Sequence, residues 1–212
     1  MIKDESYWNY ISIVSSSLES RMPRVKCKVL ISGVSGMIGA VLTDILLFSN
    51  RTYGTQYNVI GLGRSKSHAE DMFDEYEKSD YFKFVQHDIN QTIPEVGAVD
   101  YVIHAASNTH PVDYSGDPIG TITANVIGTN NLLEYAVSHG CRRFVFLSSV
   151  EIYGENKGDI ERFDEIYNGY INCNTLRAGY PESKRTGEAL CQAYGKKYNL
   201  DFVIPRLCRV YG

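Results

Sequence analysis

A tyrosine and a lysine stand four residues apart in the segment Tyr180-Pro181-Glu182-Ser183-Lys184. On a helix, this spacing places both side chains on one face. A phenol with an unperturbed pKa of about 10 is a poor base at neutral pH, but a nearby ammonium group stabilises the phenolate. The pair therefore predicts a tyrosine that acts as a base, although the same spacing occurs by chance in many sequences.

Serine hydroxyls lie upstream of this pair, at the end of the apolar run Phe146-Leu147-Ser148-Ser149. A run of this kind is typical of a buried strand. Side chains just beyond a parallel strand gather at the carboxyl edge of the sheet. We therefore expect the hydroxyl of Ser149 and the phenol of Tyr180 to meet at one edge of a sheet.

A glycine-rich segment, Gly33-Val34-Ser35-Gly36-Met37-Ile38-Gly39, follows an apolar run and precedes a helical pattern. Glycine permits a sharp turn and a close approach of the backbone to a ligand, and the helix N-terminus offers free N–H groups with partial positive charge. We expect this loop to bind the diphosphate of a dinucleotide. The alternative is a tight strand-to-helix turn that holds no ligand.

The end of the second apolar run bears on the choice between NAD and NADP. Enzymes that bind NAD usually place an acid there for the adenosine ribose, but this chain has Gly61-Leu62-Gly63-Arg64-Ser65-Lys66. Arg64, with Ser65 or Lys66, is suited to a 2′-phosphate and favours NADP, unless it is a solvated surface arginine. After the third run, Asp88 and Ile89 are candidates for the adenine side, and capping of a turn explains Asp88 equally well.

From Cys27 onward, apolar runs alternate with amphipathic segments, as expected for parallel strands covered by helices on both faces. The predicted strands are Lys28–Ser32, Val59–Leu62, Phe82–Gln86, Val99–His104, Arg143–Ser148 and Phe202–Pro205, and the predicted helices are Met37–Ser49, Pro118–His139 and Tyr180–Tyr198. This alternation predicts an α/β fold with a doubly wound parallel sheet, the Rossmann fold. The strand order should be 3-2-1-4-5-6, with ligands bound beyond the carboxyl ends of the strands.

Residues 1–25 precede this pattern and carry several aromatic and aliphatic side chains followed by a serine run. We predict an N-terminal extension, a short helix or a loop, that packs on a single dinucleotide-binding domain of residues 26–212. The net charge of −4 gives no basic field for nucleic acid, and no stretch approaches the length of a membrane span. Five cysteines without a CxxC pair and a start without a signal-peptide pattern favour a reduced, cytoplasmic protein, and we assign no metal ligands.

In order and spacing, these motifs resemble the extended short-chain dehydrogenase/reductase superfamily, in particular the NAD-dependent epimerase/dehydratase family. The resemblance runs from about Lys28 to Gly212 and rests on the glycine loop, Tyr180 with Lys184, His104-Ala105-Ala106-Ser107, Asn125-Val126-Ile127-Gly128-Thr129 and Ser148-Ser149-Val150-Glu151-Ile152-Tyr153-Gly154. It implies that Tyr180 removes a proton from a sugar hydroxyl while a hydride passes to a nicotinamide. It further implies that Lys184 tunes Tyr180 and binds the nicotinamide ribose, and that Ser149 bonds the same substrate hydroxyl. Ala105, Ala106 and Ser107 would line the cofactor path, with Ser107 also reaching the substrate, and Asn125 would be a buried hydrogen-bonding residue.

Within this family, oxidation to a 4-keto sugar precedes epimerisation, dehydration or decarboxylation. Dehydratases typically carry an Asp-Glu pair after the catalytic hydroxyl, whereas this chain has Val150-Glu151. Two other stretches resemble UDP-glucuronate decarboxylases: His104, Ser107, Pro111, Tyr114, Pro118-Ile119, Asn125, Ile127-Gly128-Thr129 and Asn131, and then Asn172, Arg177, Tyr180, Glu182, Lys184 and Arg185. By this likeness, Glu151 assists the steps after oxidation and Arg177 contacts an anionic substrate or anchors a loop. The alternatives are a structural carboxylate for Glu151 and a surface salt bridge for Arg177.

Two positions depart from the decarboxylase pattern. Gly63 stands where those enzymes have an acid, and Arg209, which we place among the substrate contacts, stands where they have an asparagine. Members of the family are usually longer and carry a C-terminal substrate lobe that is largely absent from this chain. A chain ending at Gly212 should therefore bind a dinucleotide but bind a nucleotide sugar, which we expect to be UDP-linked, poorly. A noncatalytic dinucleotide-binding module, a carbonyl reductase for a non-sugar substrate, and a homodimer formed through the two long helices remain open.

Overall fold

The computed structural model describes residues 3–21, 26–107, 116–158 and 160–210, and its centre is a parallel sheet of six strands. Each strand pairs with its neighbours in parallel, in the order β3-β2-β1-β4-β5-β7. The strands are β1 Cys27–Ser32, β2 Tyr57–Gly63, β3 Phe82–Gln86, β4 Tyr101–His104, β5 Arg143–Phe146 and β7 Phe202–Val203. This order confirms the doubly wound α/β fold and the predicted 3-2-1-4-5-6 order of the strands.

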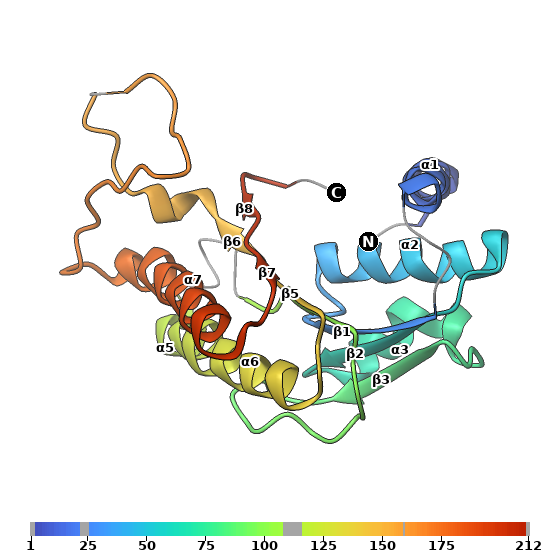
Figure 1. Cartoon of the computed structure of the whole chain (residues 1–212). Coiled ribbons are helices and arrows are strands. Elements are labelled where there is room, and N and C mark those ends of the chain that lie inside the picture. The colour runs from blue at the N-terminus through green and yellow to red at the C-terminus, as the bar shows by residue number, and fades with distance from the viewer. Residues whose placement is uncertain (1–2, 22–25, 108–115, 159, 211–212) are drawn as a thin grey trace.

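Helices cover both faces of the sheet (Figure 1). They are α1 Glu5–Arg21, α2 Met37–Tyr53, α3 Lys66–Phe73, α5 Pro118–Thr123, α6 Thr129–Ser138 and α7 Gly179–Tyr198, with short 3-10 turns at η1 Asp74–Tyr76, η3 Val150–Tyr153 and η4 Leu176–Ala178. Among the described residues, none of these helices combines the length and apolar character needed to cross a bilayer.

The alternation of side chains along each strand divides the core into two layers. Leu30 of β1 packs in a cluster with Leu132 of α6 and Cys191 of α7, whereas Val29 and Ile31 face the opposite cluster formed with α2 and α3. Successive strand residues point to opposite faces, so a strand buried on both sides reads as a continuous apolar run. This explains why the strands could be found from the sequence.

The predicted helix over residues 118–139 is interrupted. The structure has α5, then one wider π-helical turn, η2 Ala124–Gly128, and then α6. Within this turn the carbonyl of Asn125 accepts a hydrogen bond from the Thr129 hydroxyl at 2.6 Å. Such turns are rare and often occur at functional sites, and residue periodicity does not reveal them.

The fifth predicted strand, Arg143–Ser148, is divided in a similar way. β5 ends at Phe146, and β6, Ser148–Ser149, pairs in parallel with β8, Arg206–Leu207, in a separate two-stranded sheet. Figure 1 shows β6 and β8 side by side beyond the carboxyl ends of the central strands. The chain that carries the predicted catalytic serine therefore leaves the main sheet before it reaches that residue.

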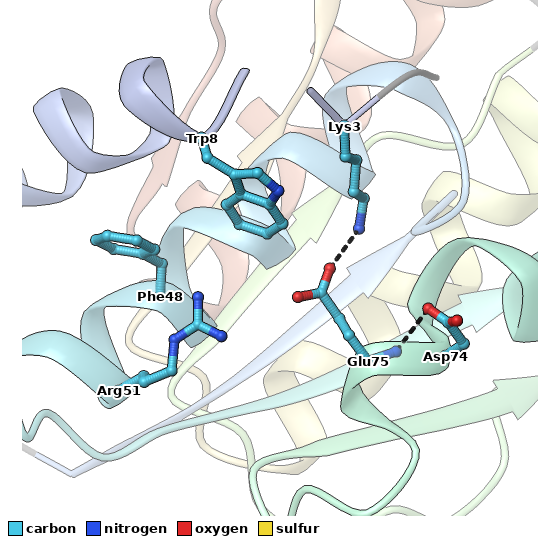
Figure 2. Close-up of a pocket in the computed structure, with 6 residues that line it drawn as sticks. All are labelled: Lys3, Trp8, Phe48, Arg51, Asp74 and Glu75. Carbon is cyan, nitrogen blue, oxygen red and sulfur yellow. Dashed lines mark hydrogen bonds and ion pairs between the residues drawn. The ribbon is translucent and has the colours of Figure 1, made fainter. Parts of the chain in front are cut away.

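The N-terminal extension forms a helix, α1, which packs on α2 (Figure 1). Its main polar anchor is Asp44 of α2, whose carboxylate is fully buried and accepts from Lys3 at 3.1 Å and from the Tyr7 hydroxyl. Figure 2 shows Trp8 of α1 beside Phe48 and Arg51 of α2. A buried carboxylate needs such partners, so this anchor couples the extension to the domain.

Candidate functional site

The glycine loop between β1 and α2 is held tightly against the chain after β4. Gly33 has a φ of +72°, and a Cβ at this position would lie 2.7 Å from the backbone of Ala106. A Cβ on Gly39 would overlap the carbonyl oxygen of Gly33 and lie 2.8 Å from Cα of Val34. Internal packing is therefore enough to require the first and third glycines of the motif.

The middle of the loop is more open. Gly36 and Met37 are exposed, and Gly36 is the N-cap of α2 with no side chain hydrogen-bonded to the first amides of the helix. An uncapped helix N-terminus attracts an anion through its free N–H groups and partial positive charge. The loop, with Ile38 and Gly39 in the first turn behind it, thus has the form needed to receive a diphosphate.

Gly63, at the end of β2, lies close to the Phe84 ring. A Cβ on Gly63 would come within 3.0 Å of the Phe84 ring. The two other polar residues proposed for a 2′-phosphate are already engaged, because Ser65 caps α3 by accepting from the amide of His68 and Lys66 pairs with Glu70 at 3.4 Å.

Arg64 is exposed, and its guanidinium makes no hydrogen bond or ion pair with another described residue, although its carbonyl accepts from Gln86 at 3.0 Å. The Asp88 carboxylate accepts a hydrogen bond from the amide of Asn90 at 3.0 Å and so caps its own turn. Turn capping was the alternative to an adenine contact for this residue. Ile89 is buried, and its side chain fills the space beside Gly128.

Tyr180 and Lys184 lie in the first two turns of α7, and both are buried. The Lys184 Nζ donates to the carbonyl of Leu147 at 2.8 Å and lies 5.9 Å from the centroid of the Tyr180 ring and 4.9 Å from that of Phe146. Burial lowers the Lys184 pKa to about 7, and the charge of Glu188 opposes that shift. The predicted pair is therefore brought together, and Lys184 is attached to the chain that leads to the predicted serine.

Ser149 is buried and is the N-cap of η3, where its hydroxyl accepts from the amide of Glu151 at 3.2 Å. The Glu151 carboxylate lies 3.9 Å from the guanidinium of Arg177, which is 73% exposed. At this distance and exposure the ion pair is weak, as is typical of a surface salt bridge.

The segment after β4 lies against the glycine loop. The amide of Ala105 donates to the carbonyl of Ser32 at 3.0 Å, and the backbone of Ala106 contacts Gly33. The Ser107 hydroxyl is buried and finds no hydrogen-bond partner among the described residues. Arg209 is exposed on the segment after β8. Pro111 and Tyr114, part of the decarboxylase resemblance, lie outside the described residues.

A chain of buried hydrogen bonds links the sheet to α7, and of its members the sequence predicted only Asn125 as a buried hydrogen-bonding residue. The imidazole of His104 bonds to the hydroxyls of Ser32, at 2.8 Å, and Thr129, at 3.0 Å. Asn125 donates from Nδ2 to the Ser183 hydroxyl at 3.0 Å, and that hydroxyl donates to the carbonyl of Tyr180 at 2.8 Å. Burial, with the Lys184 charge, lowers the His104 pKa to about 3, so His104 is neutral at neutral pH.

Glu188 was also missed by the sequence reasoning. Its carboxylate accepts from the Ser148 hydroxyl at 2.6 Å and from the Arg206 guanidinium at 3.0 and 2.7 Å. The available signal was the spacing of Tyr180, Lys184 and Glu188 at four-residue intervals, which places three polar residues on one face of a helix.

Two surface pockets of the described chain contain none of the predicted site residues. One is lined by residues of the N-terminal anchor and η1, namely Lys3, Trp8, Phe48, Arg51, Asp74 and Glu75 (Figure 2). The other is lined by residues of the loop before α7, namely Lys157, Asp164, Ile166, Tyr167, Asn168 and Gly169. The predicted site instead occupies the carboxyl edge of the sheet.

Comparisons with known proteins agree with this arrangement. The chain is 30% identical over 185 residues to UDP-glucuronic acid decarboxylase 1 of Danio rerio, which covers 87% of this chain and 42% of the relative. It is also 30% identical over 206 residues to UDP-glucuronic acid decarboxylase 2 of Arabidopsis thaliana, covering 97% of this chain and 44% of the relative. The chain thus spans less than half the length of these two proteins.

Solved structures show the same fold. A UDP-glucuronic acid 4-epimerase from Bacillus cereus in complex with NAD superposes with a TM-score of 0.66 at 26% identity, covering 87% of this chain and 57% of that one. A dTDP-glucose 4,6-dehydratase double mutant from Streptomyces venezuelae with NAD bound gives a TM-score of 0.72 at 26% identity, covering 87% and 56%. The model of the NAD dependent epimerase/dehydratase family matches residues 29–212, so the chain belongs to that family.

Proposed function

We propose that this protein binds NAD or NADP and modifies a nucleotide sugar through a 4-keto intermediate, most like a UDP-glucuronate decarboxylase. The observation that carries the proposal is the placement of Lys184. Its buried amine lies beside the Tyr180 ring and donates to Leu147, two residues before Ser149. A phenol can take a proton from a sugar alcohol as a base, a nearby ammonium group stabilises the phenolate, and a hydroxyl can hydrogen-bond to the same sugar oxygen.

The glycine loop fits the diphosphate of a dinucleotide because Gly36 and Met37 are exposed residues at an uncapped helix N-terminus. The bound nicotinamide supplies the hydride acceptor for oxidation of the sugar and the hydride donor for the final reduction. Gly63 and Arg64 favour NADP, since no acid is present to bond the ribose hydroxyls and a cation is available for a 2′-phosphate.

In the proposed reaction, Tyr180 takes the hydroxyl proton at carbon 4 as the C–H bond at that carbon loses its hydride. The Lys184 ammonium stabilises the resulting phenolate, and Ser149 donates a hydrogen bond to the same sugar oxygen. The 4-keto group then accepts the electron pair released when the neighbouring carboxylate leaves as CO2. The enolate that remains takes up a proton at carbon 5, and Glu151 is the candidate group that passes this proton to it from solvent.

Turnover separates the possible reactions. The protein is incubated with NAD or NADP and with UDP-glucuronate, and released CO2 and a UDP-pentose are measured. Release of both supports a decarboxylase, whereas the 4-epimer without CO2 indicates an epimerase and a dehydrated 4-keto-6-deoxy product from a nucleotide hexose indicates a dehydratase. Tyr180→Phe should abolish turnover, and Tyr170→Phe, an exposed tyrosine outside the site, is the matched control.

Because the chain spans about half of its relatives, dinucleotide binding is a separate test. We expect calorimetry to show binding of NAD or NADP by residues 1–212 and little binding of a nucleotide sugar. Binding of a nucleotide sugar by this chain with a micromolar Kd would refute the expectation of weak nucleotide-sugar binding. Dinucleotide binding with no turnover in a longer protein would favour a noncatalytic binding module.

The apolar surface of the interrupted helix supports a homodimer. Ile119, Ile122 and Ile127 are 74%, 40% and 45% exposed on α5 and η2. Exposed aliphatic side chains grouped on one helix are typical of interaction surfaces. Sedimentation should give a dimer for the wild-type chain and a monomer after Ile119→Glu.

A further inference from the structure

We propose that Glu188 is a positioning residue for the candidate site. It holds β6, which carries Ser149, against the face of α7 that carries Tyr180 and Lys184. The inference rests on the proposed function and adds a residue to it. Its evidence is the set of contacts that Glu188 makes with Ser148 and Arg206.

The first step is the position of Glu188 on α7. Tyr180, Lys184 and Glu188 follow one another at four-residue intervals, which places them along one face of the helix. Lys184 donates to the carbonyl of Leu147, and Glu188 accepts from the hydroxyl of Ser148 at 2.6 Å. Leu147, which joins β5 to β6, and Ser148, the first residue of β6, are thus attached to two consecutive turns of one helix.

The second step is the bond between Glu188 and β8. Arg206 donates to both carboxylate oxygens, from Nε at 3.0 Å and from Nη2 at 2.7 Å. A forked pair of this kind fixes the plane of the carboxylate as well as its position. The two side chains are 13% and 23% exposed, so water competes little with the contact.

The third step is the pairing of the two short strands. Ser148 lies opposite Arg206 and Ser149 opposite Leu207 in the β6–β8 register, and the Ser148 amide donates to the carbonyl of Pro205 at 2.9 Å. Arg206 also donates to the carbonyl of Glu165 at 2.6 Å and stacks over Tyr153, with 5.0 Å from its Cζ to the ring centroid. A two-stranded sheet of two residues each is weak by itself, so these side-chain contacts determine where Ser149 lies.

The arrangement has an electrostatic consequence for Lys184. The ionisable groups facing this amine are Glu188 and Tyr180 on α7 and His104 on β4, and His104 is neutral at neutral pH. Glu188 favours the charged form of Lys184, while Arg206 neutralises part of the charge of Glu188. Removal of Glu188 and removal of Arg206 should therefore move the Lys184 pKa in opposite directions.

The test is an NMR titration of the Lys184 side chain in the 212-residue chain without dinucleotide. Glu188→Gln keeps the shape of the side chain and removes its charge, and we expect the Lys184 pKa to fall by about one pH unit. Arg206→Gln leaves the Glu188 charge without its partner, and we expect the Lys184 pKa to rise. Glu134→Gln, at an exposed carboxylate on α6, is the matched control and should leave the pKa unchanged.

If Glu188 and Arg206 only stabilised the fold, their replacement in folded variants would not shift the Lys184 pKa in opposite directions. Equal pKa values in wild type and Glu188→Gln, or shifts of the same sign in Glu188→Gln and Arg206→Gln, would overturn the proposal. If either variant fails to fold, the hydrogen exchange rate of backbone amides is measured in Ser148→Ala. Faster exchange of the Glu151 amide, which donates to Ser149, supports the proposal, and unchanged exchange refutes it.

The readouts also separate this proposal from the proposed function. The titration needs no ligand, so opposite shifts with no dinucleotide binding by the wild-type chain would leave the positioning role of Glu188 intact and refute the dinucleotide site. Dinucleotide binding by the wild-type chain, together with an unchanged Lys184 pKa in Glu188→Gln, would support the dinucleotide site and refute the positioning role of Glu188.

Discussion

Replacement of Tyr7 by phenylalanine should reveal how strongly the N-terminal helix is attached to the domain. The Tyr7 hydroxyl donates to Asp44, whose side chain has no exposed surface, so water cannot replace the lost donor. A hydrogen bond to a charged group contributes roughly 1.5 to 3 kcal/mol, and we expect Tyr7→Phe to reduce the free energy of unfolding by about 2 kcal/mol. For a chain of this size that corresponds to a fall in Tm of about 4 to 8 °C.

The origin of this loss can be tested with a double-mutant cycle. Asp44→Asn keeps an acceptor for Tyr7 but removes the negative charge, so Tyr7→Phe should cost only about 1 kcal/mol in that background. The two effects should therefore be coupled by about 1 kcal/mol, measured by urea unfolding. Tyr10→Phe, an exposed tyrosine on the same helix, is the control and should change stability by less than about 0.5 kcal/mol. A Tm of Tyr7→Phe within a degree of wild type, or additive costs in the cycle, would refute the reasoning.

Three further predictions concern the dinucleotide site and its lysine. Gly39→Ala should destabilise the chain by roughly 2 to 4 kcal/mol in urea unfolding, because its Cβ would overlap the backbone of the preceding turn; a loss below 0.5 kcal/mol would contradict the packing described. Arg64→Gln should weaken NADP binding about tenfold in calorimetry and leave NAD binding unchanged, with Lys78→Gln, at an exposed lysine outside the site, as the control; equal losses for both cofactors would exclude a 2′-phosphate contact. Lys184 has a folded-state pKa lowered from 10.5 to about 7, so the unfolded chain binds more protons between these values and stability rises with pH across that window. The Tm of Lys184→Met relative to wild type should therefore be highest near pH 7 and decline towards pH 10, and a difference that does not vary with pH would contradict the burial of this amine.

The main sheet and the Tyr180–Lys184 pair could be predicted because both leave local patterns in the sequence. Buried parallel strands produce continuous apolar runs, and the helical spacing of the pair is independent of the rest of the fold. Gly33 lies at the turn after β1 and Gly39 in the first turn of α2, and packing alone accounts for both glycines. Their presence is thus weaker evidence of a ligand than the exposed backbone at Gly36.

The remaining features depend on tertiary contacts that a linear pattern does not contain. Asp44 occupies a helix in which a carboxylate usually faces solvent, and only the position of Lys3 and Tyr7 shows that it is buried. Glu188 presents the same difficulty, because its partners come from strands before and after α7. The π-helical turn at Asn125 was missed because one extra residue in a turn leaves the apolar periodicity almost unchanged.

The short β6–β8 pairing has a consequence for how the protein is made on the ribosome. Ser148 and Ser149 emerge before α7, but their strand partners at residues 206 and 207 emerge after it. The nascent chain can complete β1 to β5 and still lack the segment against which the serine strand is aligned. Synthesis from the N-terminus therefore supplies the first five strands of the sheet before β7 and β8, so the candidate site is expected to become ordered last.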